Sequence, residues 1–147
     1  MIVTAILSNE FHFAETDDEI SALVDYALSG RHWGSLSKFY ASDRRCSEGD
    51  ENFRGRHYPS HQFGIGVSSD GERAAAHFVS FDSEGVLVQS QSAHRQDGPD
   101  ILFSDESGQL FSSDAALPPT AVKQAALEYC RTAKLPTSIT WQEADFY

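Results

Sequence analysis

The sequence predicts an α+β domain in which an antiparallel sheet of about six to seven strands carries two helices packed on one face. Two segments, one after Thr16 and one beginning near Pro118, have apolar residues at helical spacing. The region between them consists largely of short apolar or alternating segments separated by turn residues. The length of 147 residues suits one domain, which we expect to span residues 1–147.

The chain begins with an apolar segment that predicts a strand at residues 2–7. We interpret the whole N-terminal segment, up to residue 13, as a strand and not as a signal peptide, because it has no basic residue at its start. The first helix is expected to follow Thr16, since Thr16 and Glu19 can form a capping box. Gly30 is expected to end the helix. Its apolar stripe consists of Ile20, Leu23, Val24, Ala27 and Leu28.

The middle of the chain predicts a series of strands joined by tight turns. Phe63, Ile65 and Val67 alternate with polar residues or glycine, as a half-buried strand requires. Turn residues such as Ser-Asp-Gly at 69–71 indicate hairpins. The expected strands are residues 36–40, 63–67, 74–81, 86–91, 101–103 and 109–111.

Two glycines and a histidine within these strands need a separate interpretation. Gly64 and Gly66 superficially resemble a phosphate-binding loop, but the following glycine and helix are absent, so we interpret them as strand glycines. His77 lies inside the next expected strand, and an orientation toward solvent is open.

The second helix is expected to begin near Pro118, because proline is tolerated in a first helical turn. Pro136 prevents its continuation, and residues 139–141 predict a final strand. We expect Cys130 to be a buried thiol and Trp141 to lie in the core. The apolar stripe of this helix consists of Val122, Ala125, Ala126, Tyr129, Cys130 and Ala133.

The charge of the chain excludes several classes of function. With 22 acidic and 11 basic residues the net charge is −11, which disfavours general binding to nucleic acid or to an anionic membrane. Residues 1–30 and 97–114 contain no lysine or arginine, whereas residues 31–58 hold six of the eleven basic side chains. The chain has no run of about 18 apolar residues, so we expect no transmembrane helix. The two cysteines suggest no disulfide framework, so we expect a cytoplasmic protein.

No catalytic motif is evident in the sequence, so we expect no enzyme, metal or cofactor. The best metal candidates are His57 and His61, but the proline between them prevents the helix that would place both on one face. A zinc site needs three or four ligands, which Cys46 or an acid of residues 48–51 would have to complete. A small metal-dependent hydrolase using this region is one alternative function, and a scaffold module is another.

Residues 116–144 resemble the C-terminal signature of immunity protein family one, from bacterial polymorphic-toxin systems. That signature combines an apolar residue and proline, an amphipathic helix with an aromatic residue near its end, a threonine, a proline and a strand carrying tryptophan. The matching residues are Leu117, Pro118, Val122, Tyr129, Thr132, Pro136, Ile139 and Trp141. Two positions depart from it: Ala133 stands where the family usually has glycine, and Leu135 where it often has arginine.

The resemblance implies a small cytoplasmic protein that binds and neutralises a cognate toxin domain, often a nucleic-acid deaminase. A toxin that acts on nucleic acid needs a basic cleft, and an acidic inhibitor can occupy that cleft and associate with it quickly. We therefore expect loop acids and one aromatic anchor to contact the toxin, with no direct contact to nucleic acid or membrane. The predicted contact residues are Trp33, Glu48, Asp50, Glu51, Asp97, Asp100, Asp105 and Glu106.

Overall fold

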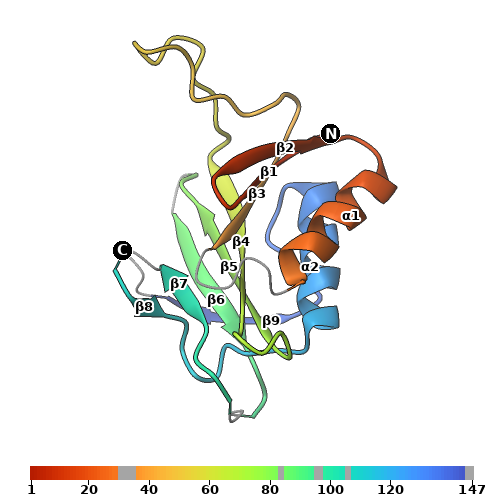
Figure 1. The fold of residues 1–147 in the computed structure, drawn as a ribbon, viewed down its shortest axis with the longest axis vertical. Coiled ribbons are helices and arrows are strands. Elements are labelled where there is room, and N and C mark those ends of the chain that lie inside the picture. The colour runs from red at the N-terminus through yellow and green to blue at the C-terminus, as the bar shows by residue number, and fades with distance from the viewer. Residues whose placement is uncertain (30–35, 83–84, 95–97, 105–106, 145–147) are drawn as a thin grey trace.

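A computed structural model describes residues 1–29, 36–82, 85–94, 98–104 and 107–144 (Figure 1). It has two helices and nine strands within these ranges. In chain order they are β1 (Ile2–Leu7), β2 (Glu10–Ala14), α1 (Asp17–Leu28), β3 (Ser37–Ser42), β4 (His61–Val67), β5 (Ala74–Ser80), β6 (Val86–Gln91), β7 (Leu102–Ser104), β8 (Gln109–Leu110), α2 (Pro119–Thr132) and β9 (Thr140–Glu143).

Seven of the strands form one antiparallel sheet in the order β2-β1-β3-β4-β5-β6-β9. Both helices lie against the same face of this sheet and share its larger core cluster (Figure 1). Strands β7 and β8 form a separate two-stranded sheet. The α+β class, the antiparallel sheet and the two helices on one face are therefore confirmed.

The N-terminal segment forms a hairpin and not the one strand that we predicted. Leu7 pairs with Glu10, so the turn between β1 and β2 contains only Ser8 and Asn9. Both turn residues have left-handed backbone, with φ of 50° and 67°. This is the two-residue connection whose twist suits antiparallel strands. Its sequence lacks the usual glycine, which is why the prediction omitted β2.

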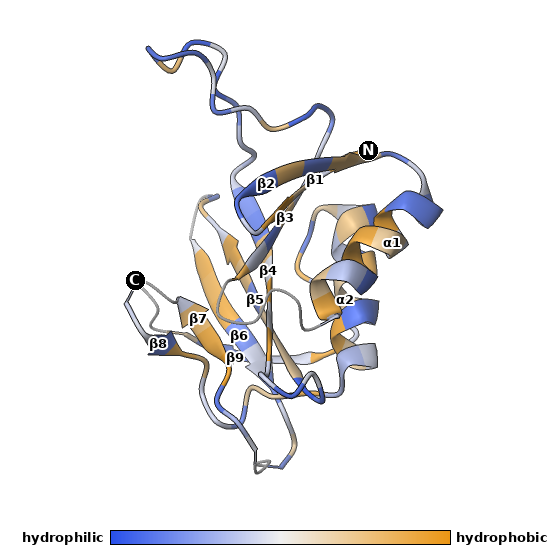
Figure 2. Cartoon of the chain, viewed as in Figure 1, coloured by the Kyte–Doolittle hydropathy of each residue, from blue (hydrophilic) through white to orange (hydrophobic). Residues whose placement is uncertain are grey.

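The helical face of the sheet carries the larger core. The capping box of α1 is present, because the Thr16 hydroxyl accepts a hydrogen bond from the Glu19 N–H and the Glu19 carboxylate accepts one from the Thr16 N–H. Three residues of the predicted stripe of α1 are buried: Ile20, Val24 and Ala27. Figure 2 shows the corresponding apolar sides of both helices and of the sheet.

The second helix ends in a strained residue. Cys130 is buried, as predicted, and Trp141 is partly buried, packs against the core and donates its indole N–H to the Pro136 carbonyl at 2.8 Å. Ala133 caps α2 with a left-handed φ of 57°, and its N–H bonds to the Tyr129 carbonyl. That conformation favours glycine, because a Cβ atom is crowded there.

The opposite face of the sheet is covered over only part of its area. A second core cluster joins the β7–β8 hairpin and the chain after it to Ala75 of β5. Gly66 permits this packing, because a Cβ atom at residue 66 would lie 2.7 Å from a ring carbon of Phe111. His77 is fully buried under the same cover, with its ring 5.1 Å from that of Phe103, so the open orientation toward solvent is not adopted.

The strain at Ala133 gives a test of the fold. Ala133→Gly should raise the free energy of unfolding by about 0.5–1 kcal/mol, because relief of the left-handed strain exceeds the extra chain entropy of glycine. Urea denaturation measures the change. Ala126→Gly, within the same helix, is the matched control and should lower stability. Equal losses in the two variants would contradict the assigned cap.

Candidate functional site

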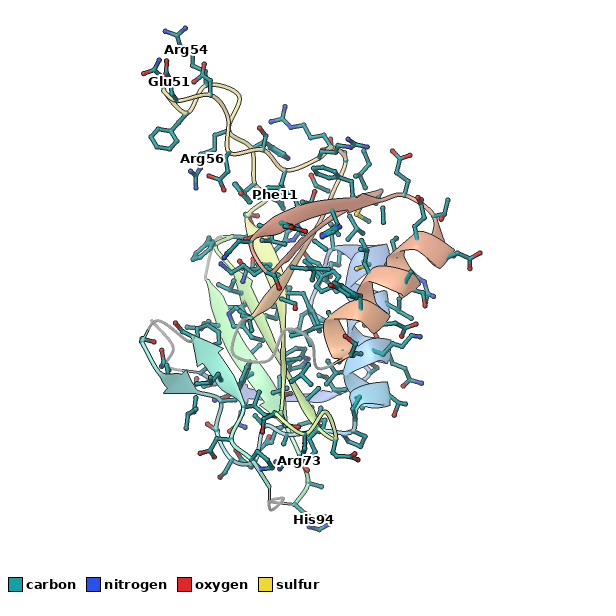
Figure 3. All side chains as sticks on the ribbon, in the orientation of Figure 1. Phe11, Glu51, Arg54, Arg56, Arg73 and His94 are labelled. Carbon is teal, nitrogen blue, oxygen red and sulfur yellow. The ribbon has the colours of Figure 1, made fainter. Side chains whose placement is uncertain are left out.

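Residues 43–60 connect β3 to β4 and project beyond the end of the sheet (Figures 1 and 3). We call this segment the arm. Ser47 and His57 join its two sides through reciprocal backbone hydrogen bonds of 3.0 and 2.9 Å. The arm therefore has its own backbone structure beyond the sheet, while Cys46 at its base is buried and donates its N–H to the Thr4 hydroxyl of β1 at 3.0 Å.

The tip of the arm is organised by one carboxylate. Asp50 accepts hydrogen bonds from the N–H groups of Asn52 and Arg54, both at 2.9 Å, and its carbonyl accepts one from the Phe53 N–H. This turn holds Phe53 at a φ of 61° with 65% of the residue exposed. A left-handed backbone at a residue other than glycine costs free energy on folding, and such strain gathers at functional positions. Phe53 is thus a candidate contact residue.

The base of the arm contains a neutralised acid. The two carboxylate oxygens of Glu48 are both engaged, one by the Tyr58 hydroxyl and the other by the Arg56 guanidinium at 3.1 Å. Burial and the adjacent Glu48 raise the pKa of Tyr58, so its hydroxyl remains a donor. The Arg56 guanidinium also lies 5.3 Å from the centre of the Tyr58 ring.

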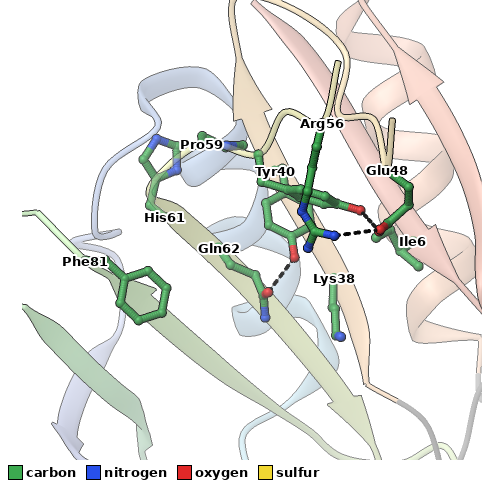
Figure 4. A pocket seen from close by; sticks show the side chains of 10 residues that line it. Ile6, Lys38, Tyr40, Glu48, Arg56, Pro59, His61, Gln62 and Phe81 are labelled. Carbon is green, nitrogen blue, oxygen red and sulfur yellow. Dashed lines mark hydrogen bonds and ion pairs between the residues drawn. The ribbon is translucent and has the colours of Figure 1, made fainter. Parts of the chain in front are cut away.

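A pocket of about 270 Å³ lies between the base of the arm and the uncovered part of the sheet (Figure 4). The Tyr40 hydroxyl donates to the Gln62 side-chain oxygen at 2.6 Å across β3 and β4, and the Tyr40 ring meets the Tyr58 ring edge-on at 5.1 Å. These contacts fix the wall of the pocket. Its lining residues are Ile6, Lys38, Tyr40, Glu48, Arg56, Tyr58, Pro59, His61, Gln62 and Phe81.

The pocket continues into an apolar hollow of about 580 Å³. The two share Gln62 and Phe81, and the hollow adds Val86 and Leu87 at the start of β6. Phe81 is 76% exposed and Val86 is 39% exposed. An exposed apolar area beside a polar pocket is typical of a surface that binds another protein.

A buried hydroxyl supports the floor of this region. The Tyr129 hydroxyl of α2 accepts a hydrogen bond from the Ala41 N–H at 3.1 Å and lies 2.7 Å from His61 Nδ1. The hydroxyl keeps both its proton and a second lone pair, so the direction of this bond follows the tautomer of His61, and donation to Nδ1 requires a neutral imidazole with its proton on Nε2. Burial lowers the pKa of His61 and so favours the neutral imidazole.

The histidines of the metal hypothesis are engaged in hydrogen bonds. His57 Nδ1 lies 2.8 Å from the Arg44 guanidinium, which can only donate, and His57 Nε2 lies 3.4 Å from the Ser42 hydroxyl. His61 is bound to Tyr129. Across the part of the chain that the structure describes, no group of three or more His, Cys, Asp or Glu side chains is placed to hold a metal ion.

The comparison with known families adds a decisive observation. The family described as Immunity protein Imm1 matches residues 9–143. The chain belongs to the Imm1 family. This membership supports an immunity function and implies a cognate toxin as the binding partner. No curated protein matches the chain. Within the described ranges, neither helix of this Imm1 protein is long and apolar enough to cross a membrane.

The structure separates the contact residues that we predicted for this Imm1 protein. Glu48, Asp50 and Glu51 all lie on the arm, where Glu48 and Asp50 have the internal partners given above. Asp100 lies toward the opposite end, because it follows Pro99, whose carbonyl bonds to Arg73 at that end (Figure 3). Four predicted residues lie outside the described ranges and stay predictions: Trp33, Asp97, Asp105 and Glu106.

Sequence reasoning did not select Phe53, Lys38 or Tyr40. The available signal for Phe53 was an aromatic residue within a polar, glycine-containing segment. For Lys38 and Tyr40 the available signal was the alternation of side chains along β3. This alternation directs both residues away from the helices.

His77, which Gly64 of β4 separates from Lys38 in the sheet, makes the stability of the Imm1 protein sensitive to acid. Burial, with a smaller effect from Lys38, lowers the pKa of His77 from 6.5 to about 4. The neutral ring therefore stabilises the fold fully above pH 6.5, and this contribution decreases as the pH falls toward 4. The loss over this interval is about 3 kcal/mol.

His77→Leu should remove that part of the pH dependence. Urea denaturation of both proteins near neutral pH and near pH 4 compares the two slopes. We expect the variant to lose about 3 kcal/mol less than the wild type on acidification. His94→Leu, which changes an exposed histidine, is the control and should retain the wild-type slope. An unchanged slope in His77→Leu would refute this assignment.

Proposed function

We propose that this protein acts in the cytoplasm, binds a cognate toxin domain that modifies nucleic acid, and covers the toxin's substrate cleft without catalysing a reaction. The contact surface consists of the arm, the pocket at its base and the adjoining hollow. The observation that carries the proposal is the arm tip, where a strained and exposed Phe53 projects from the sheet. A nucleic-acid deaminase is the specific toxin class that we propose.

The arm suits insertion into a cleft. Its backbone bonds between Ser47 and His57 and its turn at Asp50 already order the tip, so binding costs less conformational entropy. Burial of Phe53 against a toxin would remove a large apolar surface from water. The backbone strain that weakens the isolated protein would then be offset in the complex.

The charge of the protein supports a basic partner. A net charge of −11 attracts a toxin whose cleft must hold phosphate groups and increases the association rate. On the arm, Glu51 is the exposed acid for which the structure shows no internal hydrogen bond or ion pair within the described ranges, so we assign the steering role to Glu51.

Co-expression tests the function as a whole. The toxin domain encoded beside this gene should arrest growth when expressed alone, and this protein should restore growth and co-purify with the toxin. Sequencing of cellular nucleic acid reports the deaminase class, because deaminated cytosine is read as thymine. Growth arrest that persists, without co-purification, would refute the immunity proposal, whereas a toxin that arrests growth without deamination when expressed alone would refute only the toxin class.

Phe53→Ala should weaken toxin binding at least about tenfold, as expected for the loss of a central aromatic contact. Its stability should change by less than about 1 kcal/mol, since the ring is exposed. Calorimetric titration with a catalytically inactive toxin domain measures the affinity. Leu110→Ala is the control, because Leu110 is an exposed apolar residue on β8, away from the arm. Similar affinities for both variants would exclude the arm tip from the interface.

Glu51→Lys should slow association several-fold at low salt and change dissociation little, because a rim charge acts mainly through long-range attraction. The difference should decrease at high salt. Asp100→Lys makes the same charge change near the opposite end of the molecule and is the matched control. If Asp100→Lys slows association more than Glu51→Lys, the toxin approaches the other end, and the arm is not the contact surface.

A further inference from the structure

We infer that the pocket at the base of the arm receives an acidic side chain of the toxin, whose carboxylate pairs with the Lys38 ammonium. This inference rests on the proposed function and specifies the chemistry of one contact within it. At this contact a basic residue of this protein meets an acidic residue of the toxin, which is the opposite of the pairing expected from the net charge.

Lys38 is placed on the sheet so that its charge enters the pocket. It pairs with Ile6 of β1 and Gly64 of β4, and it points away from the helices because its neighbours Ser37 and Phe39 are buried on the other side. Lys38 is partly buried and lines the pocket, as Figure 4 shows. The strand register therefore fixes the face of the sheet from which its side chain enters the pocket.

The ammonium of Lys38 has no carboxylate within ion-pair distance among the residues that the structure describes. The other charges on the pocket wall cancel, because Arg56 and Glu48 pair with each other at 3.1 Å and Tyr58 donates to the same carboxylate. Lys38 thus gives the pocket a net positive charge.

The neighbouring polar groups also favour an acceptor as ligand. The Gln62 oxygen is occupied by the Tyr40 hydroxyl, so the Gln62 amide presents its N–H donors. Figure 4 shows this amide nitrogen and the Lys38 ammonium on the same side of the pocket. A carboxylate would accept from both groups, whereas a lysine or arginine of a partner would meet like charge.

The dimensions of the site favour a side chain over a free metabolite. The volume of about 270 Å³ lies just below the range of about 300–1,000 Å³ for typical small-molecule sites. The exposed Phe81 at the rim and the apolar hollow beyond it need a larger partner to cover them. Once a protein covers the rim, the loss of water strengthens the charge pair.

Substitutions of Lys38 test the contact with the catalytically inactive toxin domain as the probe. Lys38→Met keeps the length of the side chain and should weaken binding at least about tenfold, Lys38→Glu should weaken it further, and Lys38→Arg should stay within a few-fold of wild type. Lys134→Met is the matched control, because Lys134 is exposed in the turn after α2. Thermal unfolding of each variant shows whether it remains folded.

A second variant introduces a carboxylate into the pocket itself, so that it competes with the proposed toxin carboxylate. Gln62→Glu keeps the shape of the side chain, puts a carboxylate beside Lys38 and should weaken toxin binding to a similar extent. Changing single acidic residues of the toxin to lysine should then identify one that restores binding to Lys38→Glu. That restoration would assign the partner carboxylate directly.

The possible outcomes separate this inference from the proposed function. Wild-type affinity in Lys38→Met, Lys38→Glu and Gln62→Glu would overturn the pocket contact while the immunity function stands. Tighter binding by Lys38→Glu would also overturn it, because the toxin would then present a basic group. A wild-type protein that neither binds nor protects against the toxin would overturn both.

Discussion

The hydroxyl of Tyr129 is the contact on which the arrangement of the candidate site depends. It accepts from Ala41, near the end of β3, and lies 2.7 Å from Nδ1 of His61, the first residue of β4. The arm leaves the sheet after β3 and returns at β4. One side chain of α2 therefore contacts both strands at the points where the arm begins and ends. The Tyr129 ring also stacks on Phe63 at 5.6 Å in the core. The position of the arm is thereby tied to helix packing.

Strand alternation transmits this constraint to the pocket. Along β3, Phe39 and Ala41 face the helices, while Lys38 and Tyr40 face the pocket. A slip of one residue would exchange these sets, exposing core side chains and burying a charge. The same antiparallel register therefore determines the stability of the core and the chemistry of the pocket, although the two lie on opposite faces of the sheet.

Local signals made the helices and most strands predictable from the sequence, because a capping box, a periodic stripe and an alternating strand each act over a few residues. The Ser8–Asn9 turn was missed because its left-handed backbone lacks the usual glycine. The arm was not predictable, since Ser47 and His57 carry no pairing signal. For the same reason the sequence does not reveal the internal partners of Glu48, which lie ten and eight residues later, and its contact with a toxin stays a prediction.

The separation of the arm tip from the two core clusters affects how the sequence of such a protein can diverge during evolution. Neither core cluster takes a described side chain from residues 43–60. Substitutions at Glu51, Phe53 or Arg54 can therefore accumulate with little penalty to folding, while the sheet and helices stay constant. An inhibitor built in this way can follow a diversifying toxin by altering a few protruding positions, and duplicated copies can acquire distinct partners on one inherited framework.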